Sequence, residues 1–178
     1  MKLAISADHA GFPLKEAIKS AYPDIEWLDL GAGEIQPGDD YPDYAFTLAM
    51  AVAGGYAPMG VSVCGAGVGA SMALNRHPAI RAALCTTPDI ATLSRDHNDA
   101  NVLCLAGRFQ TVDDVKPIFE AFINTPFSGD ARHVRRIRKL SLMDDESNPT
   151  ACDHDHANGC CGGHGSGGHC HNDDGTTW

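Results

Sequence analysis

Residues 60–69 read Gly-Val-Ser-Val-Cys-Gly-Ala-Gly-Val-Gly, a short apolar run that continues into three alternating glycines. Nearly every side chain of residues 60–64 is apolar and small, as expected for a strand that is buried on both faces of a sheet. The glycines permit a tight turn, and the residues that follow have the pattern of a helix. The stretch therefore predicts a buried strand that leads through a glycine-rich turn into a helix.

The same alternation of patterns extends in both directions from this stretch. Strands are predicted at residues 3–6, 26–30, 60–64, 80–85 and 102–106, and helices at 13–21, 44–53, 68–76, 88–95, 112–124 and 131–143. Strands that alternate with helices indicate βαβ units. We therefore expect an α/β domain with a mostly parallel five-stranded sheet covered by helices on both faces. Ligands of such sheets bind beyond the C-terminal strand ends, here residues 7–11, 64–69, 86–88 and 107–108.

The composition is that of one globular domain with an acidic extension. The chain has 178 residues, of which 43% are hydrophobic. Residues 1–143 carry 16 acids and 13 bases, whereas residues 144–178 carry seven acids and no Lys or Arg. A nearly neutral body does not favour a nucleic-acid-binding protein. We find neither a signal peptide nor an apolar run of about 20 residues that could span a membrane. We therefore expect a cytoplasmic protein whose seven cysteines are reduced.

The composition changes abruptly after Pro149. Residues 152–171 contain four Cys, five His and six Gly without apolar periodicity. We interpret residues 144–178 as a disordered tail that follows a folded domain at residues 1–143. Thiolates and imidazoles suit Zn²⁺, Ni²⁺ or Cu⁺, although the spacing matches no standard zinc finger and an unselected low-complexity extension is the alternative. The candidate metal ligands are Cys152, His154, His156, Cys160, Cys161, His164, His169, Cys170 and His171.

Cys64 ends the buried strand at the point where the glycine-rich turn begins. Backbone amides of such a turn, together with a helix N-terminus, can hold an oxygen anion, and the same field favours a thiolate. A thiolate beside an anion cradle suits the removal of a proton from a carbon next to a carbonyl. A buried structural cysteine is the alternative. The turn also fits a dinucleotide fingerprint, but the next predicted strand lacks the acid that should follow, so this match is weak.

Three further groups of polar side chains are candidates for a site. Asp8 and His9 follow the first predicted strand, where a helix-capping turn is the alternative. His97 lies in the polar, turn-prone residues 94–101 and could exchange protons near neutral pH, although the segment could equally be a plain loop. Arg132 and Arg136 share one face of the last predicted helix, which suits a phosphate or, alternatively, is a solvated charged face.

In order and spacing, these pieces together resemble the type B ribose-5-phosphate isomerases and their galactose-6-phosphate isomerase relatives. The resemblance covers about residues 1–143 and rests on residues 6–12, 40–45, 64–69, 75–82, 94–103 and 132–136. It implies a Rossmann-like three-layer α/β/α subunit in a homodimer, or a dimer of dimers. The active sites would lie between subunits, with the last helix reaching into the partner's site. The implied reaction is aldose–ketose isomerisation of a sugar phosphate, most of all ribose 5-phosphate to ribulose 5-phosphate, without a cofactor.

The resemblance also implies a role for each matched residue. Cys64 would move a proton between C1 and C2 through an enediolate, and His97, with Asp8 nearby, would open the sugar ring. The remaining residues would bind substrate: the amides of Gly65, Ala66, Gly67, Val68 and Gly69 as an anion cradle, Tyr41 and Asn98 as sugar ligands, and His9, Arg108, Arg132 and Arg136 as phosphate ligands. Many members have Thr or Ser at the position of Ala66, so here a water or a backbone group must replace that hydroxyl, or the rate or substrate differs.

Two other functions stay open at this point. The Cys- and His-rich tail favours a metal-binding or metal-storage protein built on an isomerase-like scaffold. The glycine-rich turn leaves a nucleotide-binding oxidoreductase as a more distant alternative. Activity on a pentose phosphate without added metal separates an isomerase from a metal-binding protein, and retention of a nicotinamide cofactor on purification would favour the oxidoreductase.

Overall fold

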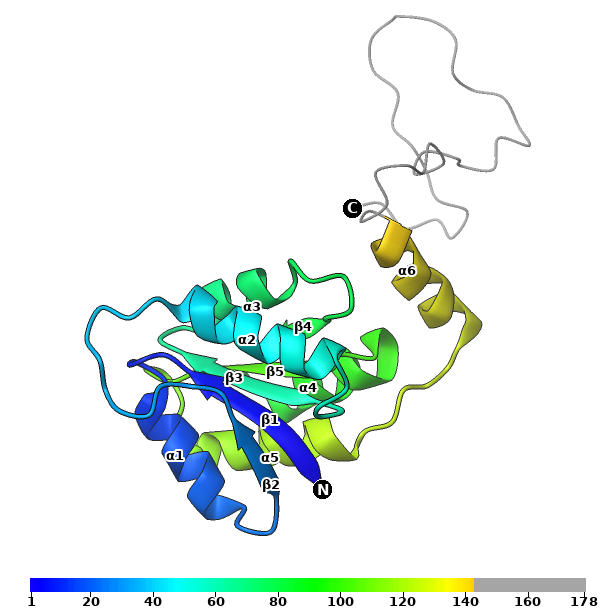
Figure 1. The fold of residues 1–178 in the computed structure, drawn as a ribbon. Coiled ribbons are helices and arrows are strands. Elements are labelled where there is room, and N and C mark those ends of the chain that lie inside the picture. Colours follow the sequence, from blue (N-terminus) through cyan, green and yellow to red (C-terminus); the bar gives the residue numbers. More distant parts are fainter. Residues whose placement is uncertain (143–178) are drawn as a thin grey trace, which may run out of the picture. The chain divides into compact units, whose positions relative to one another are not determined.

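The computed structural model describes residues 1–142, and these residues form a five-stranded, wholly parallel sheet between two layers of helices (Figure 1). The strands are β1 (Lys2–Ala7), β2 (Glu26–Asp29), β3 (Gly60–Cys64), β4 (Ala82–Leu84) and β5 (Val102–Ala106), in the spatial order β2-β1-β3-β5-β4. The predicted α/β architecture is confirmed. The predicted tail, its boundary and its metal ligands lie outside the described residues.

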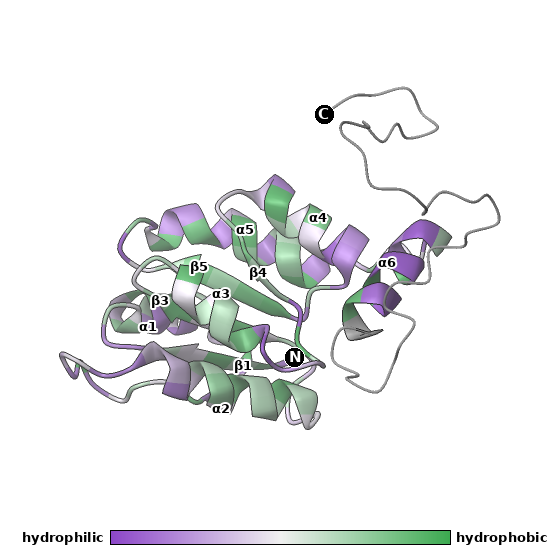
Figure 2. Ribbon diagram, turned by 90° about the horizontal axis from the view of Figure 1, so that it is seen from above, coloured by the Kyte–Doolittle hydropathy of each residue, from purple (hydrophilic) through white to green (hydrophobic). Residues whose placement is uncertain are grey.

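Helices cover both faces of the sheet, as Figure 2 shows from above. They are α1 (Phe12–Ala21), α2 (Tyr41–Ala53), α3 (Val68–Leu74), α4 (Pro88–Asn98), α5 (Val112–Asn124) and α6 (Ala131–Leu142). On one face, α1, α4 and α5 pack on alternate strand residues such as Ile5 and Leu103. On the other face, α2 and α3 pack on the intervening residues, such as Ala4 and Cys104. Because both faces are covered, β1, β3 and β5 are almost completely buried, as their apolar sequences predict.

Two helices are longer than predicted, and both differences affect the site. Helix α2 begins at Tyr41 instead of residue 44, because Pro42 falls in the first turn, where the missing N–H is not needed. Helix α4 continues to Asn98, so His97 lies in a helix and not in the predicted loop. Asp99 then ends the helix in the left-handed region, with φ of 45°. Strand β4, by contrast, is shorter than the predicted residues 80–85.

A buried lysine connects α1 to the segment that follows β2. The side chain of Lys15 is 1% exposed, and its Nζ donates to both carboxylate oxygens of Asp29 at 2.9 Å. It also donates to the carbonyl of Ala32 at 2.8 Å, which fixes the start of the loop between β2 and α2. Within residues 1–142, none of the helices combines the length and the apolar character needed to cross a membrane.

Candidate active site

The carboxyl ends of β1 and β3 meet at the point where the chain changes direction across the sheet. After β1 the chain enters α1 on one face, and after β3 it enters α3 on the other face. Parallel sheets bind ligands in the crevice that such a change of direction leaves. The register of Ser6 with Ser62 and Ala7 with Val63 places the next residues, Asp8 and Cys64, side by side at this crevice. Neighbouring strands are about 4.8 Å apart, so the carboxylate and the thiol share one small site.

Cys64 is nearly buried, and the turn after it wraps around its sulfur. The backbone N–H of Gly67 donates to Sγ at 3.2 Å. Gly67 has φ of 73°, and a Cβ there would lie 2.5 Å from the side chain of Leu84, so glycine is required. The turn is tied to the end of β5, because the Cys64 carbonyl accepts from Gly107 at 2.8 Å. The thiol is therefore held against the glycine-rich turn by the backbone N–H of Gly67.

A phenol ring and a guanidinium group flank this turn. A Cβ at Gly69 would lie 2.6 Å from Cζ of Tyr41, so the ring of Tyr41 packs directly on that glycine. A Cβ at Gly65 would lie 3.4 Å from the guanidinium carbon of Arg108. Both side chains are exposed at the crevice. The fold thus brings Tyr41 and Arg108, which are distant from the turn in sequence, next to it.

Asp8 and His9 complete this part of the site, and Asp39 joins them. Asp8 is buried, and its carboxylate accepts from the backbone N–H of Gly11 at 2.8 Å. His9 contacts Asp39 through both its backbone N–H and its ring Nδ1. Burial by itself would raise the pKa of Asp39, but hydrogen bonds from His9 and from the Tyr44 hydroxyl lower it below the usual value. Burial and the neighbouring Asp39 raise the pKa of Tyr44. Sequence reasoning missed Asp39.

We call these residues the first cluster: Asp8, His9, Tyr41, residues 64–69 and Arg108. The other predicted site residues form a second cluster at the C-terminal end of α4 and on α6: His97, Asn98, Arg132 and Arg136. The ring of His97 lies 4.2 Å from the ring of His133, centroid to centroid, and its Nε2 lies 3.2 Å from Asp96. Arg132 and Arg136 are exposed. In the second cluster, two cationic side chains thus accompany a histidine pair.

His133 is buried against His97 and supports the second cluster. Its Nδ1 lies 2.8 Å from the hydroxyl of Ser128. Burial lowers the pKa of His133, and the neighbouring His97 and Arg132 lower it further. The ring therefore favours the neutral form, which packs on His97 without adding charge.

The two clusters lie at opposite edges of the sheet in a single chain. Helix α4 runs back from the carboxyl end of β4 to the amino end of β5, a length of about 16 Å. Arg81, which precedes β4, donates to the Asn98 carbonyl at 2.9 Å, which places Asn98 at the amino edge. Cys64 and Asp8 lie at the carboxyl edge. Within one chain, Asp8 and His97 therefore do not lie side by side.

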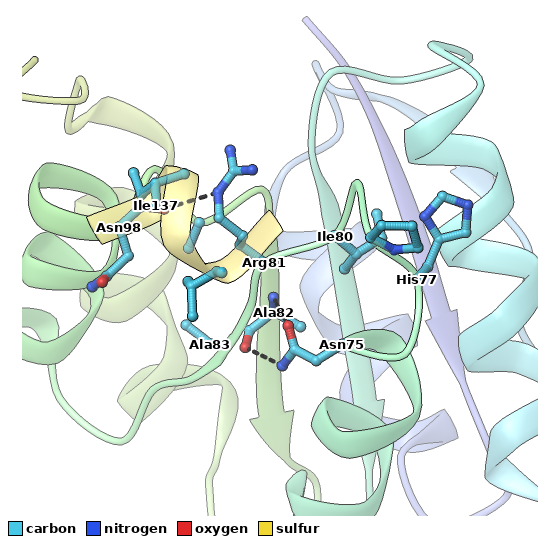
Figure 3. A pocket seen from close by; sticks show the side chains of 11 residues that line it. Asn75, His77, Ile80, Arg81, Ala82, Ala83, Asn98 and Ile137 are labelled. Atoms are coloured by element: carbon cyan, nitrogen blue, oxygen red, sulfur yellow. Dashed lines mark hydrogen bonds between the residues drawn. The ribbon is translucent and has the colours of Figure 1, made fainter. Parts of the chain in front are cut away.

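The structure also contains a cavity of about 540 Å³, which lies beside the second cluster and not at Cys64 (Figure 3). Asn98 borders it, together with Ile137 and Leu140 of α6. Asn75 closes another side by hydrogen bonds with the backbone of Ala82. In the part of the chain that the structure describes, no group of three or more His, Cys, Asp or Glu side chains could hold a metal ion.

Comparison with known proteins gives one consistent result. The sequence profile of the Ribose/Galactose Isomerase family matches residues 3–140. The chain is 38% identical over 149 residues to the ribose-5-phosphate isomerase B of Escherichia coli strain K12, covering 83% of this chain and 99% of the relative. The solved ribose 5-phosphate isomerase of Thermotoga maritima is 44% identical, with a TM-score of 0.76 over 79% of this chain and 97% of that chain.

A second solved structure contains a ligand. The ribose-5-phosphate isomerase B of Mycoplasma genitalium, solved with bound ribulose-5-phosphate, is 37% identical with a TM-score of 0.76. The match covers 82% of this chain and 97% of the Mycoplasma genitalium chain. A parallel α/β fold with a thiol and a glycine-rich turn at its crevice, matched at this level, defines the protein as a sugar-phosphate isomerase. The chain belongs to the Ribose/Galactose Isomerase family.

Proposed function

We propose that this enzyme interconverts ribose 5-phosphate and ribulose 5-phosphate, with Cys64 as the base that transfers the proton. The observation that carries the proposal is the thiol of Cys64, which lies beside Asp8 and accepts a hydrogen bond from the Gly67 N–H. The hydrogen bond from the Gly67 N–H suits a sulfur that must carry negative charge before it takes the proton. The names of the relatives described above give a five-carbon sugar phosphate as their substrate, which supports the same substrate here.

The proposed reaction moves hydrogen within one molecule and needs no outside oxidant. After ring opening, the Cys64 thiolate takes the proton from C2 of the aldose, and the electron pair shifts to give an enediolate. The thiol then returns that proton to C1, while a hydroxyl proton passes from the C2 oxygen to the C1 oxygen, which leaves the ketose. Ala66 has no hydroxyl, so the backbone amides of residues 65–69 or a water stabilise the enediolate oxygens.

We further propose that each active site is completed by a second subunit. The first and second clusters carry complementary chemistry and lie at opposite edges of one chain, so one site can contain both only if two chains contribute. The apolar side chains exposed on α2 and α3 support such an interface, because Phe46 is 48%, Met50 62% and Met72 65% exposed. Groups of large apolar side chains on a surface mark interaction sites. A two-fold homodimer would form two equivalent sites.

In this dimer the substrate phosphate lies between the subunits. His9 and Arg108 of one chain would bind it together with the partner subunit's Arg132 and the partner subunit's Arg136. Two guanidinium groups four residues apart on one helix can donate to separate phosphate oxygens. The partner subunit's His97 would then stand close to Asp8 and open the sugar ring.

The test is an aldose–ketose assay on sugar phosphates of four, five and six carbons, without added metal. We expect ribose 5-phosphate to have the highest kcat/KM. Cys64→Ala should lower kcat by about 10²–10⁴-fold or more and abolish deuterium exchange at C2. Cys85→Ala is the matched control, because burial raises the pKa of Cys85 to about 11 and keeps it a thiol in the core. Near-normal exchange in Cys64→Ala would show that Cys64 is structural and that the mechanism is wrong.

A further inference from the structure

Asp39 contacts His9 from two directions although the two residues are separated by 30 positions in sequence. Both carboxylate oxygens accept from the backbone N–H of His9 at 3.1 Å, and Oδ1 also contacts the ring Nδ1. The carboxylate is 8% exposed, whereas the ring of His9 is 29% exposed. A nearly buried anion therefore holds a histidine whose ring is open to the crevice.

These contacts determine which atom of His9 is available to a ligand. A carboxylate can only accept, so the proton between the two groups belongs to Nδ1. In the hydrogen bonds that residues 1–142 form, Nε2 has no partner, and it is the nitrogen left for a ligand. A ring that donates from both nitrogens is a cation, and Asp39 supplies the balancing charge. The arrangement suits a phosphate oxygen at Nε2.

Asp39 does not cap the helix that follows its loop. The adjacent Asp40, and not Asp39, is the residue that precedes the first turn of α2, and it makes no side-chain cap. The loop is fixed at its other end by Lys15, through the Ala32 carbonyl. The hydrogen bonds of the Asp39 side chain go to His9 and to the Tyr44 hydroxyl.

We propose that Asp39 is the positioning residue for phosphate binding, because it orients His9 so that Nε2 meets a phosphate oxygen of the substrate. The proposal rests on the proposed function, in which His9 is a phosphate ligand. It assigns Asp39 an effect on binding and none on the proton transfer at Cys64.

The test compares Asp39→Asn with Glu34→Gln, which removes one negative charge from an exposed position in the same loop. We expect Asp39→Asn to raise KM for ribose 5-phosphate and the dissociation constant for inorganic phosphate by about tenfold, the usual value of a hydrogen bond to a charged group. The kcat should stay within about twofold, since binding of the phosphate is weakened equally in the ground state and in the transition state. Glu34→Gln should match the unchanged protein in all three quantities.

Two further measurements separate a positioning role from a structural one. With inorganic phosphate bound, nitrogen-15 NMR of the His9 ring should show a proton on both Nδ1 and Nε2 in the unchanged protein, and fewer such rings in Asp39→Asn at the same pH. In a His9→Gln background, Asp39→Asn should cause no further loss of phosphate affinity. An unchanged fraction of doubly protonated rings with unchanged phosphate affinity, or an equal loss in the His9→Gln background, would overturn the proposal. If the unchanged protein fails to convert ribose 5-phosphate, the proposed function fails, while phosphate affinity and the protonation of the His9 ring still decide the role of Asp39.

Discussion

Mixing two inactive variants should restore activity if each active site takes one cluster from each chain. One variant is Cys64→Ala, which damages the first cluster, and the other is Arg132→Ala/Arg136→Ala, which damages the second. Random exchange of equal amounts puts about half of the subunit pairs into mixed dimers. Each mixed dimer has one site with both defects and one site with neither. We therefore expect about one quarter of the activity of the unchanged protein.

A matched control places all three substitutions in one chain and mixes it with the unchanged chain. Each site of a mixed dimer then contains one damaged cluster, so mixed dimers should be inactive. Activity should fall from about one half before exchange to about one quarter after it. If each site instead lay within one chain, the first mixture would regain nothing and the second would keep one half.

The assay uses subunits with different affinity tags, so that mixed dimers can be isolated and their composition confirmed by native mass spectrometry. Substrate is kept well below KM, because loss of the two arginines acts mainly on binding. Each arginine should contribute about 10- to 100-fold in kcat/KM. Isolated mixed dimers of Cys64→Ala with Arg132→Ala/Arg136→Ala that are no more active than either parent would refute the shared site.

Three other predictions concern stability and the tail. Lys15→Met should lower the free energy of unfolding by about 3 kcal/mol in urea titrations, because it leaves the Asp29 carboxylate and the Ala32 carbonyl without their buried donor. Lys19→Met is the control: Lys19 is a more exposed partner of Asp29, so its loss should cost about 1 kcal/mol or less. The pKa of His133 is lower in the folded protein than the ordinary value of 6.5. The contribution of His133 to stability is therefore complete above pH 6.5 and is lost as the pH falls through the pKa of the folded state. The urea midpoint should thus fall less between neutral and acidic pH in His133→Gln than in the unchanged protein, and an equal fall in both would contradict this. Ending the chain at Asn148 should leave kcat and KM unchanged and abolish uptake of Zn²⁺, Ni²⁺ or Cu⁺ in equilibrium dialysis; equal uptake by both forms would contradict the metal-binding interpretation of the tail.

The sheet and the first cluster could be predicted because local rules determine them. Apolar runs as uniform as β3 have few alternatives to a buried parallel strand, and the carboxyl ends of such strands collect ligands. The end of α4 could not be predicted in this way. Residues 96–98 are polar and turn-prone, but Arg81, from outside the helix, and Arg95, from within it, bind the Asp99 carboxylate and the carbonyls of residues 98–100. The contacts of Arg81 are long-range, and together with the local contacts of Arg95 they extend the helix past the point where its sequence favours a turn.

The contact between Asp39 and His9 depends on the path of a loop, which residue patterns do not encode. The sequence predicts only that residues 39–42 form a turn, and it gives no reason to choose Asp39 over Asp40. The path of the loop is fixed at one end by the hydrogen bond from Lys15 to the Ala32 carbonyl and at the other end by the first turn of α2. Long-range constraints of this kind decide which of two neighbouring acids faces the site.

The geometry of a single chain also bears on substrate choice in the proposed dimer. In that dimer, the chemistry at C1 and C2 would take place at Cys64, at the carboxyl edge of the sheet, whereas the phosphate would be held largely by arginines of the partner subunit. The number of carbons between the reacting carbons and the phosphate must therefore match a distance set by the subunit interface and not by either chain alone. Since Cys64 and the adjacent glycine turn are rigidly tied to β5 through Gly107, the adjustable element is the partner's α6, which packs on its own chain mainly through α4. We therefore expect substitutions at the contact between α6 and α4 to change the preference between five- and six-carbon sugar phosphates. Substitutions around Cys64 should not change it.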